Sequence, residues 1–301
     1  MSNVLWRDIR STLRRNDGVV YRLLLAFIVV FVLLHLARLP AFFLNHALDL
    51  HALIRPVALP AALPELIQRP WTILSYAFVH INLFHLLFNA LTLFWFGKIF
   101  CEFMQPRMLF PLFLTGALLG GFIYLAAYNL LPALWPARPQ TQLIGASAGV
   151  MAIMVATATL VPEYTMFLLL LGAVRIKWIA LTLLVLSILA LPGPNSGGQF
   201  AHLGGAVMGF VYIRLLQRGY DLFGWLEKLS QGQRRRPMRK TSERRFGAWS
   251  TSFFPSAPRQ APLSKEERLN AILDKISASG YDHLTQEEKE FLRRYGEENE
   301  S

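Results

Sequence analysis

The sequence predicts an all-α membrane protein, in which a bundle of six transmembrane helices is followed by a small cytoplasmic helical hairpin at the C-terminus. The chain has 301 residues, of which 54% are hydrophobic and 16% are charged, and its mean hydropathy is +0.38. This composition is too apolar for an ordinary soluble domain. Six apolar runs alternate with polar or proline-containing segments, and the last part of the chain carries charged residues and helix-capping patterns instead.

A transmembrane helix needs about 20 mostly apolar residues, and the apolar runs approach that length. The first run is too long for the apolar part of a signal peptide, and other spans follow it. Residues 40–75 predict a long loop that lies in the membrane interface. We place the six helices at residues 20–39, 81–100, 108–131, 143–161, 178–191 and 200–216.

The segment before the fifth helix has two interpretations. Residues 166–174 are apolar but too short to cross a bilayer, and Arg175 and Lys177 follow them. We interpret this segment as interfacial. The alternative is one helix over residues 166–191, which would hold two charges near its middle, an unfavourable arrangement in a membrane. After the fifth helix, the prolines and glycines of residues 192–198 predict a loop.

The distribution of basic residues predicts that both ends of the chain are cytoplasmic. Six spans place both termini on one side of the membrane, and Lys and Arg gather in the segments on that side. Cytoplasmic segments of membrane proteins carry such an excess. We therefore expect an integral multi-pass membrane protein with both termini in the cytoplasm. The same rule explains the net charge of +11, so we expect no nucleic acid as a partner.

The tail after the last span forms separate regions. Two S/T-x-x-E capping boxes, Ser264 to Glu267 and Thr285 to Glu288, predict the starts of two helices. The basic stretch before them is rich in polar residues and proline, which favours disorder. The sequence identifies no cytoplasmic partner for the hairpin. We expect an N-terminal cytoplasmic segment at 1–19, the membrane domain at 20–218, a disordered linker at 219–263 and the hairpin at 264–301.

Ser147 and His202 are the leading candidates for catalysis. Ser147 stands at the start of the fourth apolar run and His202 near the start of the sixth. Both runs enter the membrane from the outer side, so the two residues lie at similar depth. Polar groups inside a membrane are functional candidates, and this pair has the composition of a nucleophile and its base. The pattern predicts a serine hydrolase that works inside the bilayer.

The start of the second span adds hydrogen-bond donors. His85 and Asn89 are four residues apart and therefore share one helix face. Acyl transfer needs donors aimed at the developing oxyanion, and these two side chains, together with the amide of Ser147, are suitable. His80 lies near the interface, and we weigh a structural role and a role in the site about equally.

Four glycines flank the two catalytic candidates. Gly145 and Gly149 form one GxxxG pattern, and Gly205 and Gly209 form another. Such patterns allow membrane helices to approach closely. Contact between the fourth and sixth helices through these glycines would bring Ser147 and His202 together. The Gly-x-Ser-x-Gly motif differs from the nucleophile elbow of soluble hydrolases, because we predict no strand before Ser147.

Together these motifs resemble the rhomboid family of intramembrane serine proteases, in its bacterial form with a cytoplasmic C-terminal helical tail. The matching pieces are His80-x4-His85-x3-Asn89, Gly145-Ala146-Ser147-Ala148-Gly149 and Ala201-His202-x2-Gly205-x3-Gly209. They lie within residues 69–210.

The resemblance implies a six-helix core and a Ser147–His202 dyad without a carboxylate. It also implies an oxyanion site made by His85, Asn89 and the Ser147 amide, with the loop before the sixth helix as a mobile cap. Substrates would be transmembrane segments of membrane proteins, with helix-weakening residues near the outer surface. The bilayer is the other expected partner, and no cofactor or metal is expected.

Two positions depart from the family pattern. Rhomboids often carry Trp-Arg in the first loop, where this chain has Arg69-Pro70-Trp71. Many bacterial members have a tyrosine four residues after the serine, stacked on the histidine, and here that position is Met151. The sequence therefore leaves open what holds the His202 ring. It also leaves open the substrate, the cleavage-site preference, the oligomeric state and the role of the hairpin.

Two other functions compete with proteolysis. One is a catalytically inactive rhomboid-like protein that binds membrane clients, although such relatives usually lose the serine or the histidine. The other is a transporter, whose spans should carry more polar groups at the membrane midplane and an internal repeat. Neither of those features is visible in the sequence.

Overall fold

A computed structural model of the protein describes residues 11–13, 17–37, 39, 43, 50–168, 172–224, 272 and 285–299. Most of the predicted N-terminal segment and of the linker, together with the first helix of the predicted hairpin, lies outside these residues. The chain divides into two compact units, Met1–Phe254 and Pro255–Ser301. Each unit is described by itself.

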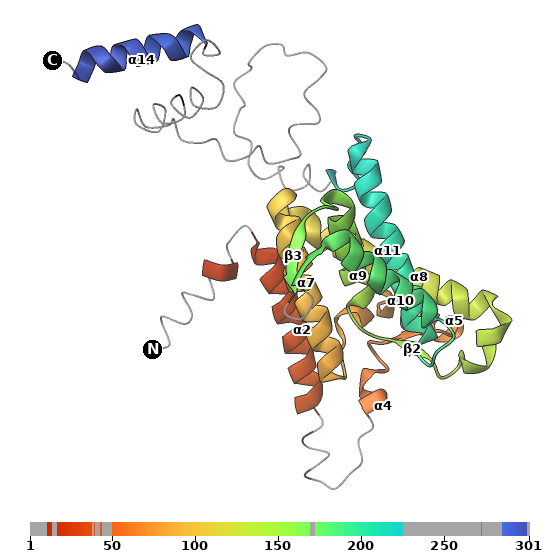
Figure 1. Cartoon of the computed structure of the whole chain (residues 1–301). Coiled ribbons are helices and arrows are strands. Elements are labelled where there is room, and N and C mark those ends of the chain that lie inside the picture. The colour runs from red at the N-terminus through yellow and green to blue at the C-terminus, as the bar shows by residue number, and fades with distance from the viewer. Residues whose placement is uncertain are drawn as a thin grey trace, which may run out of the picture. The chain divides into compact units, whose positions relative to one another are not determined.

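The first unit is mostly helical, and each predicted apolar run contains a helix (Figure 1). Four helices are long and apolar enough to cross a membrane, namely Gly18–Leu36, Leu83–Phe103, Pro106–Leu130 and Ser196–Gln217. The protein is therefore an integral membrane protein. The helices that correspond to the six runs are α2 Gly18–Leu36, α7 Leu83–Phe103, α8 Leu109–Leu130, α9 Ser147–Leu160, α10 Ile176–Leu189 and α11 Ser196–Gln217.

Helices α9 and α10 have 14 residues each. Helix α9 is shorter than predicted, whereas α10 has the predicted length and begins two residues earlier than expected. A helix of that length rises about 21 Å, which is less than the roughly 30 Å hydrocarbon core of a bilayer. That these two helices also cross the membrane stays a prediction. The fourth predicted span starts late because residues 142 and 143 form a strand, β2 Gln142–Leu143, instead of a first helical turn.

The expectation that no strand precedes Ser147 is wrong. Strand β2 pairs antiparallel with β1 Leu59–Pro60, and the aligned partners are Leu59 with Leu143 and Pro60 with Gln142. The all-α prediction needs this correction, since a two-residue pairing between distant segments leaves no periodic signal. The predicted loop at 40–75 also contains short helices from residue 50 onwards, α4 Leu50–Ile54, α5 Leu63–Gln68, α6 Thr72–Ser75 and the 3-10 helix Tyr76–Phe78.

The segment before α10 is an antiparallel hairpin of β3 Thr165–Leu168 and β4 Gly172–Arg175. The alternative of one helix over residues 166–191 is therefore wrong. Glu163 forms an ion pair with Arg175 at 2.9 Å and another with Lys177. The hydrogen bond from Lys177, with the positive charge of both partners, lowers the pKa of the Glu163 carboxyl. These charges gather where the hairpin meets α10, outside the helix interior.

The predicted loop at 192–198 is also shorter than expected, because α11 already begins at Ser196. Gly197 and Gly198 belong to the first turn of that helix. A Cβ on Gly197 would lie 2.8 Å from the ring of Tyr124. Gly197 therefore allows α11 to pack closely against α8, and it does not interrupt the helix. The remaining connections in the unit are the 3-10 helices Pro106–Met108 and Pro132–Ala137.

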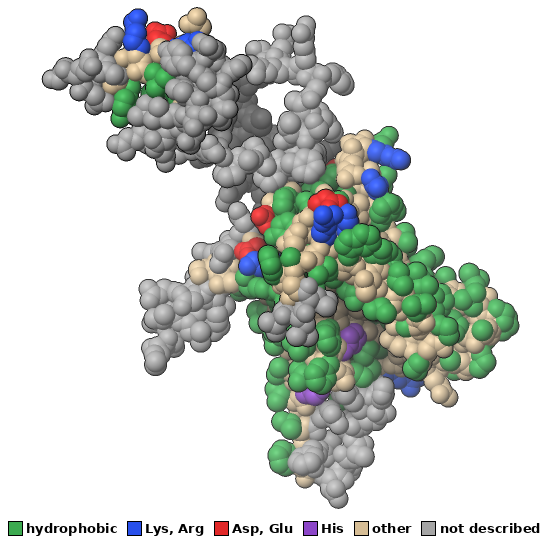
Figure 2. Space-filling model, viewed as in Figure 1, with side chains coloured by type: hydrophobic (Ala, Val, Ile, Leu, Met, Phe, Trp, Pro, Cys, Tyr) green, Lys and Arg blue, Asp and Glu red, His purple; other side chains and the backbone are tan. Residues whose placement is uncertain are grey.

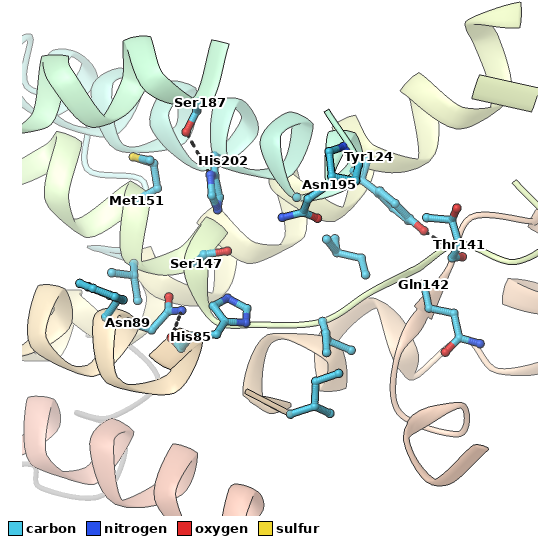
Figure 3. Close-up of a pocket in the computed structure, with 18 of the residues that line it drawn as sticks. His85, Asn89, Tyr124, Thr141, Gln142, Ser147, Met151, Ser187, Asn195 and His202 are labelled. Carbon is cyan, nitrogen blue, oxygen red and sulfur yellow. Dashed lines mark hydrogen bonds between the residues drawn. The ribbon is translucent and has the colours of Figure 1, made fainter. Parts of the chain in front are cut away.

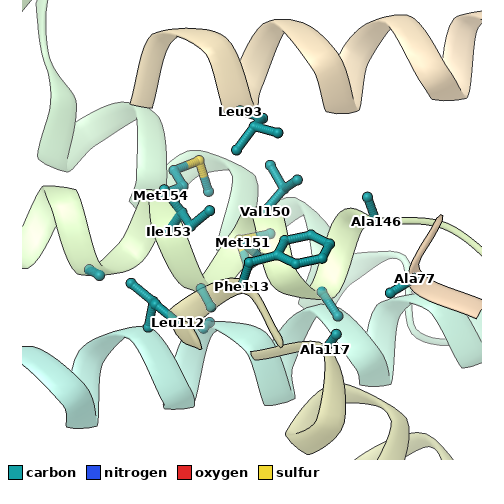
Figure 4. Close-up of a cluster of buried hydrophobic side chains, with 14 of the residues drawn as sticks. Ala77, Leu93, Leu112, Phe113, Ala117, Ala146, Val150, Met151, Ile153 and Met154 are labelled. Carbon is teal, nitrogen blue, oxygen red and sulfur yellow. The ribbon is translucent and has the colours of Figure 1, made fainter. Parts of the chain in front are cut away.

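Helix α9 forms the centre of the first unit and packs against α7, α8 and α11. Its side chains interlock with Leu93 of α7 and with Leu112 and Phe113 of α8 (Figure 4). By contrast, α2 and α10 leave many apolar side chains exposed, among them Leu33 at 60% and Leu189 at 70%. Figure 2 shows such hydrophobic side chains over much of this unit's visible face, as a lipid-facing surface requires.

The second unit contains the helix α14 Gln286–Asn299. The predicted capping box at its start is present. The N–H of Thr285 donates to Glu288 Oε2 at 2.7 Å, and the N–H of Glu288 donates to Thr285 Oγ1 at 3.3 Å. These reciprocal bonds satisfy two donors that a helix start would otherwise leave open.

Candidate active site

The chain between β2 and α9 is held in place by hydrogen bonds that its backbone N–H groups donate to residues 76 and 80. The N–H of Gly145 donates to the Tyr76 carbonyl at 2.9 Å, and the N–H of Ala146 donates to His80 Nε2 at 3.3 Å. Gly145 has a φ of +114°, and a Cβ there would lie 2.5 Å from His85 Cε1. Glycine is needed on both counts, since other residues avoid this φ.

Ser147 is the first residue of α9. Its amide is therefore among the helix-start N–H groups that lack an intrahelical acceptor, and it lies at the positive end of the helix dipole. The side chain lines a cavity of about 730 Å³. His85, Asn89, Met151, Ser187 and His202 line the same cavity (Figure 3).

His202 reaches this cavity because α11 packs closely on α9. A Cβ on Gly205 would lie 2.0 Å from the carbonyl oxygen of Ala148, and one on Gly209 would lie 2.2 Å from that of Ala152. The His202 ring points from α11 toward Ser147 (Figure 3). Within the described residues, no hydrogen bond joins the two side chains. Catalytic hydrogen bonds are often long or misaligned before substrate binds.

The expectation that both glycine pairs join α9 to α11 is only half right. Gly205 and Gly209 contact α9, as expected. Gly149 instead faces α8, where a Cβ would lie 2.4 Å from the Phe113 ring, and Gly145 faces His85 of α7. The spacing of glycines shows which of them share a helix face, but it does not show which neighbour that face meets.

His85 and Asn89 lie together on α7, on the Ser147 side of the cavity (Figure 3). The Asn82 side chain caps the start of α7 by accepting from the N–H groups of Phe84 at 2.9 Å and His85 at 3.2 Å. Asn89 Nδ2 donates to the His85 carbonyl at 2.8 Å. A carboxamide nitrogen carries two protons, so one donor remains for a ligand.

His80 is fully buried and does not line the cavity. Its Nε2 accepts the Ala146 amide, so the neutral ring carries its proton on Nδ1, for which no described residue is a hydrogen-bond partner. Burial and, to a smaller extent, the nearby His85 ring, whose centroid is 5.2 Å away, together lower the pKa of His80 to about 4. The hydrogen bond that His80 makes is therefore with the backbone before Ser147.

Ser187 of α10 is a site residue that the sequence reasoning missed. Its Oγ lies 3.1 Å from His202 Nδ1, and the pair is drawn in Figure 3. Met151, the other residue expected beside the ring, lines the same cavity. The available signal was a single serine near the end of a mostly apolar run, which is weak because serines are common in packed membrane helices.

The arrangement is suited to acyl transfer. A hydroxyl, an imidazole directed at it, and several N–H donors converge on one cavity, which is what a nucleophile, base and oxyanion site require. No Asp or Glu is among the described residues that line the cavity. In the part of the chain that the structure describes, no three His, Cys, Asp or Glu side chains are grouped to hold a metal.

Comparison with known proteins gives three findings. Residues 68–219 match the family model of the Rhomboid domain. Residues 261–298 match a family of unknown function, DUF6576. The chain is 30% identical over 157 residues to the RHOMBOID-like protein 12, mitochondrial, of Arabidopsis thaliana, an alignment that covers 49% of this chain and 47% of that protein. The chain thus spans about half the length of this curated relative.

Proposed function

The chain belongs to the rhomboid family, and from this premise we propose that it is an intramembrane serine endopeptidase. It cleaves transmembrane segments of membrane proteins near the outer face through a dyad of Ser147 and His202. The observation that carries this proposal is that Ser147, at the start of the buried helix α9, and His202, on α11, line one cavity with the donors of α7.

In the proposed reaction, Ser147 Oγ attacks a peptide carbonyl while His202 Nε2 takes its proton. The oxyanion is held by the Ser147 amide, by the free N–H of Asn89 and by the His85 ring. His202 then gives the proton to the leaving amine. Water, activated by the same ring, hydrolyses the acyl-enzyme.

The substrate class follows from backbone chemistry. In an intact helix each peptide group is tied into the hydrogen-bond ladder and is shielded by side chains. Residues that weaken the helix expose the carbonyl that Ser147 must attack. We therefore expect substrates to be transmembrane segments with such residues near the outer surface. We also expect the enzyme to bind them within the bilayer.

For the membrane arrangement, we propose that α9 and α10 also cross, giving six spans with both termini in the cytoplasm of a bacterial inner membrane. Basic residues of the described chain favour this orientation. Arg22, Lys98 and Arg107 lie at one end of α2, α7 and α8, and Arg175, Lys177 and Arg214 lie near the ends of α9, α10 and α11 that would share that side. Short spans are accommodated by local thinning of the bilayer.

The test is cleavage of a model transmembrane substrate by the purified full-length protein in liposomes. Wild type is compared with Ser147→Ala and His202→Ala, and each is checked for folding by thermal unfolding. We expect cleavage by the wild type and a loss of at least about 1,000-fold in either variant. Cleavage that survives Ser147→Ala overturns the dyad. A folded wild type that neither cleaves nor reacts with a fluorophosphonate favours the inactive, client-binding alternative.

A further inference from the structure

The inner face of α10 carries one buried polar side chain. Of its 14 residues, only Ile176, Ala180 and Ser187 are buried. Ser187 is 6% exposed, whereas its neighbour Leu186 is 53% exposed. A buried hydroxyl needs a hydrogen-bond partner.

Hydroxyls on the neighbouring helices find that partner in their own backbone. Thr92, Thr157 and Thr159 each donate to the carbonyl four residues earlier, at 2.8, 2.7 and 2.7 Å. This is the usual way for a hydroxyl to be satisfied inside an apolar helix. Thr157 also has a hydrogen bond to the Phe96 carbonyl of α7 at 3.3 Å. The hydrogen bond of Ser187 is different, because its partner is a side chain of another helix, His202 Nδ1, at 3.1 Å.

The partner on one imidazole nitrogen decides the state of the other nitrogen. To act as a base toward Ser147, His202 needs an unprotonated Nε2, and the proton must therefore sit on Nδ1. The Oγ of Ser187 can accept from that N–H. It continues to accept when the ring is doubly protonated, so the contact lasts through the whole proton transfer.

Met151 lines the cavity beside the ring but cannot do the same work. Its thioether has no proton and is only a weak acceptor, and its unbranched side chain adapts to its surroundings instead of fixing them. No carboxylate among the described residues lines the cavity. Ser187 is thus the group in contact with the ring that can accept a hydrogen bond from a protonated Nδ1 (Figure 3).

We infer that Ser187 is a positioning residue for His202, which holds the ring toward Ser147 with Nδ1 protonated. The inference rests on the proposed function, since it concerns the base of the same dyad. A neutral oxygen here takes the place that an aspartate has in a Ser-His-Asp triad, and it orients the ring without adding a negative charge.

The experiment compares full-length Ser187→Ala, Ser187→Thr and Thr182→Ala with the wild type in the liposome cleavage assay. Thr182 is an exposed hydroxyl residue on the same helix and serves as the matched control. We expect Ser187→Ala to lower kcat about tenfold, the effect of losing one hydrogen bond, with little change in KM. Ser187→Thr, which keeps the hydroxyl, and Thr182→Ala should stay within about twofold of the wild type.

A second readout is the protonation of the ring. Nitrogen NMR of histidine-labelled protein should show His202 with its proton on Nδ1 in the wild type and a mixture of tautomers in Ser187→Ala. A merely structural role of Ser187 would leave this signal unchanged. The His202→Ala variant identifies the resonance.

The outcomes separate this inference from the proposed function. If the wild type fails to cleave, the proposed function fails. If the wild type cleaves and Ser187→Ala keeps its kcat and its tautomer, only the role of Ser187 is overturned. A rise in KM without a fall in kcat also overturns it, because that result assigns Ser187 to substrate contact. If Ser187→Thr folds but is as impaired as Ser187→Ala, the hydroxyl is not the group that positions His202.

Discussion

Helices α9 and α10 have the same length and similar apolar character, but they have opposite surroundings. Each has 14 residues and contributes a serine that faces His202 or its cavity. Most of α9 is buried between α7, α8 and α11, whereas α10 buries three side chains. The proposed nucleophile therefore stands on the most enclosed helix, and the proposed partner of the base stands on a loosely packed one. On this proposal, enclosure holds Ser147, and one hydrogen bond holds His202.

The largest effect is expected from breaking the contact between α9 and α11. In Gly205→Val, the new side chain would begin 2.0 Å from the Ala148 carbonyl oxygen. Backbone cannot move aside as a side chain can, so we expect a loss of about 3 kcal/mol or more and no cleavage. Thermal unfolding in detergent measures the loss of stability, and the liposome assay measures the loss of cleavage.

The matched control for this variant is Val207→Leu. Val207 lies on the same helix and is 54% exposed, so an added carbon meets only lipid or detergent. Its stability should equal that of the wild type. Equal stability of Gly205→Val and Val207→Leu would contradict the close approach of the two helices.

The second prediction compares the two short helices directly. Ile153 of α9 is fully buried, and Leu186 of α10 is 53% exposed. Ile153→Ala should lower the free energy of unfolding by about 3 kcal/mol because it leaves a cavity. Leu186→Ala should lower it by less than about 1 kcal/mol. Thermal unfolding of both variants in one detergent measures the difference, and equal losses would mean that α10 is as enclosed as α9.

The third prediction concerns how the two helices are held at their starts. The start of α9 depends on neutral His80, whose folded pKa of about 4 is below its ordinary value near 6.5. As pH falls below 6.5, the unfolded chain binds a proton that the folded chain does not, so stability declines until about pH 4. The decline attributable to His80 is about 3 kcal/mol at most.

The start of α10 should respond only at lower pH. The ion pairs of Glu163 lower the pKa of that carboxyl below its ordinary value of 4.5. The stability that these ion pairs contribute is therefore present above pH 4.5 and is lost as pH falls through the lowered pKa of Glu163. Between pH 6.5 and 4.5, acid should weaken the start of α9 and leave that of α10 intact.

The control for the pH effect is His80→Gln. Glutamine can still accept the Ala146 amide but does not titrate. We expect its unfolding temperature to fall less than that of the wild type between pH 7 and pH 5. Parallel curves for the two proteins would show that His80 is not the titrating group.

Much of the fold could be predicted because helices in a membrane satisfy their backbone locally. The apolar runs predicted the ends of α2, α7, α8 and α11 to within a few residues. The pairing of β1 with β2 and the β3–β4 hairpin escaped prediction. A strand pairing as short as β1–β2 depends on a distant partner, and the hairpin segment had the same apolar composition as an interfacial helix.

The sequence by itself determined the helices and singled out Ser147, His202, His85 and Asn89, because polar groups within apolar runs are conspicuous wherever the helices lie. Only the tertiary structure decided which helices touch. It assigned Gly205 to the α9 contact and Gly149 to α8, and it placed Ser187 beside His202. The physical reason is that a hydrogen bond between helices requires specific rotations and distances of both partners, and no periodicity within one segment records them.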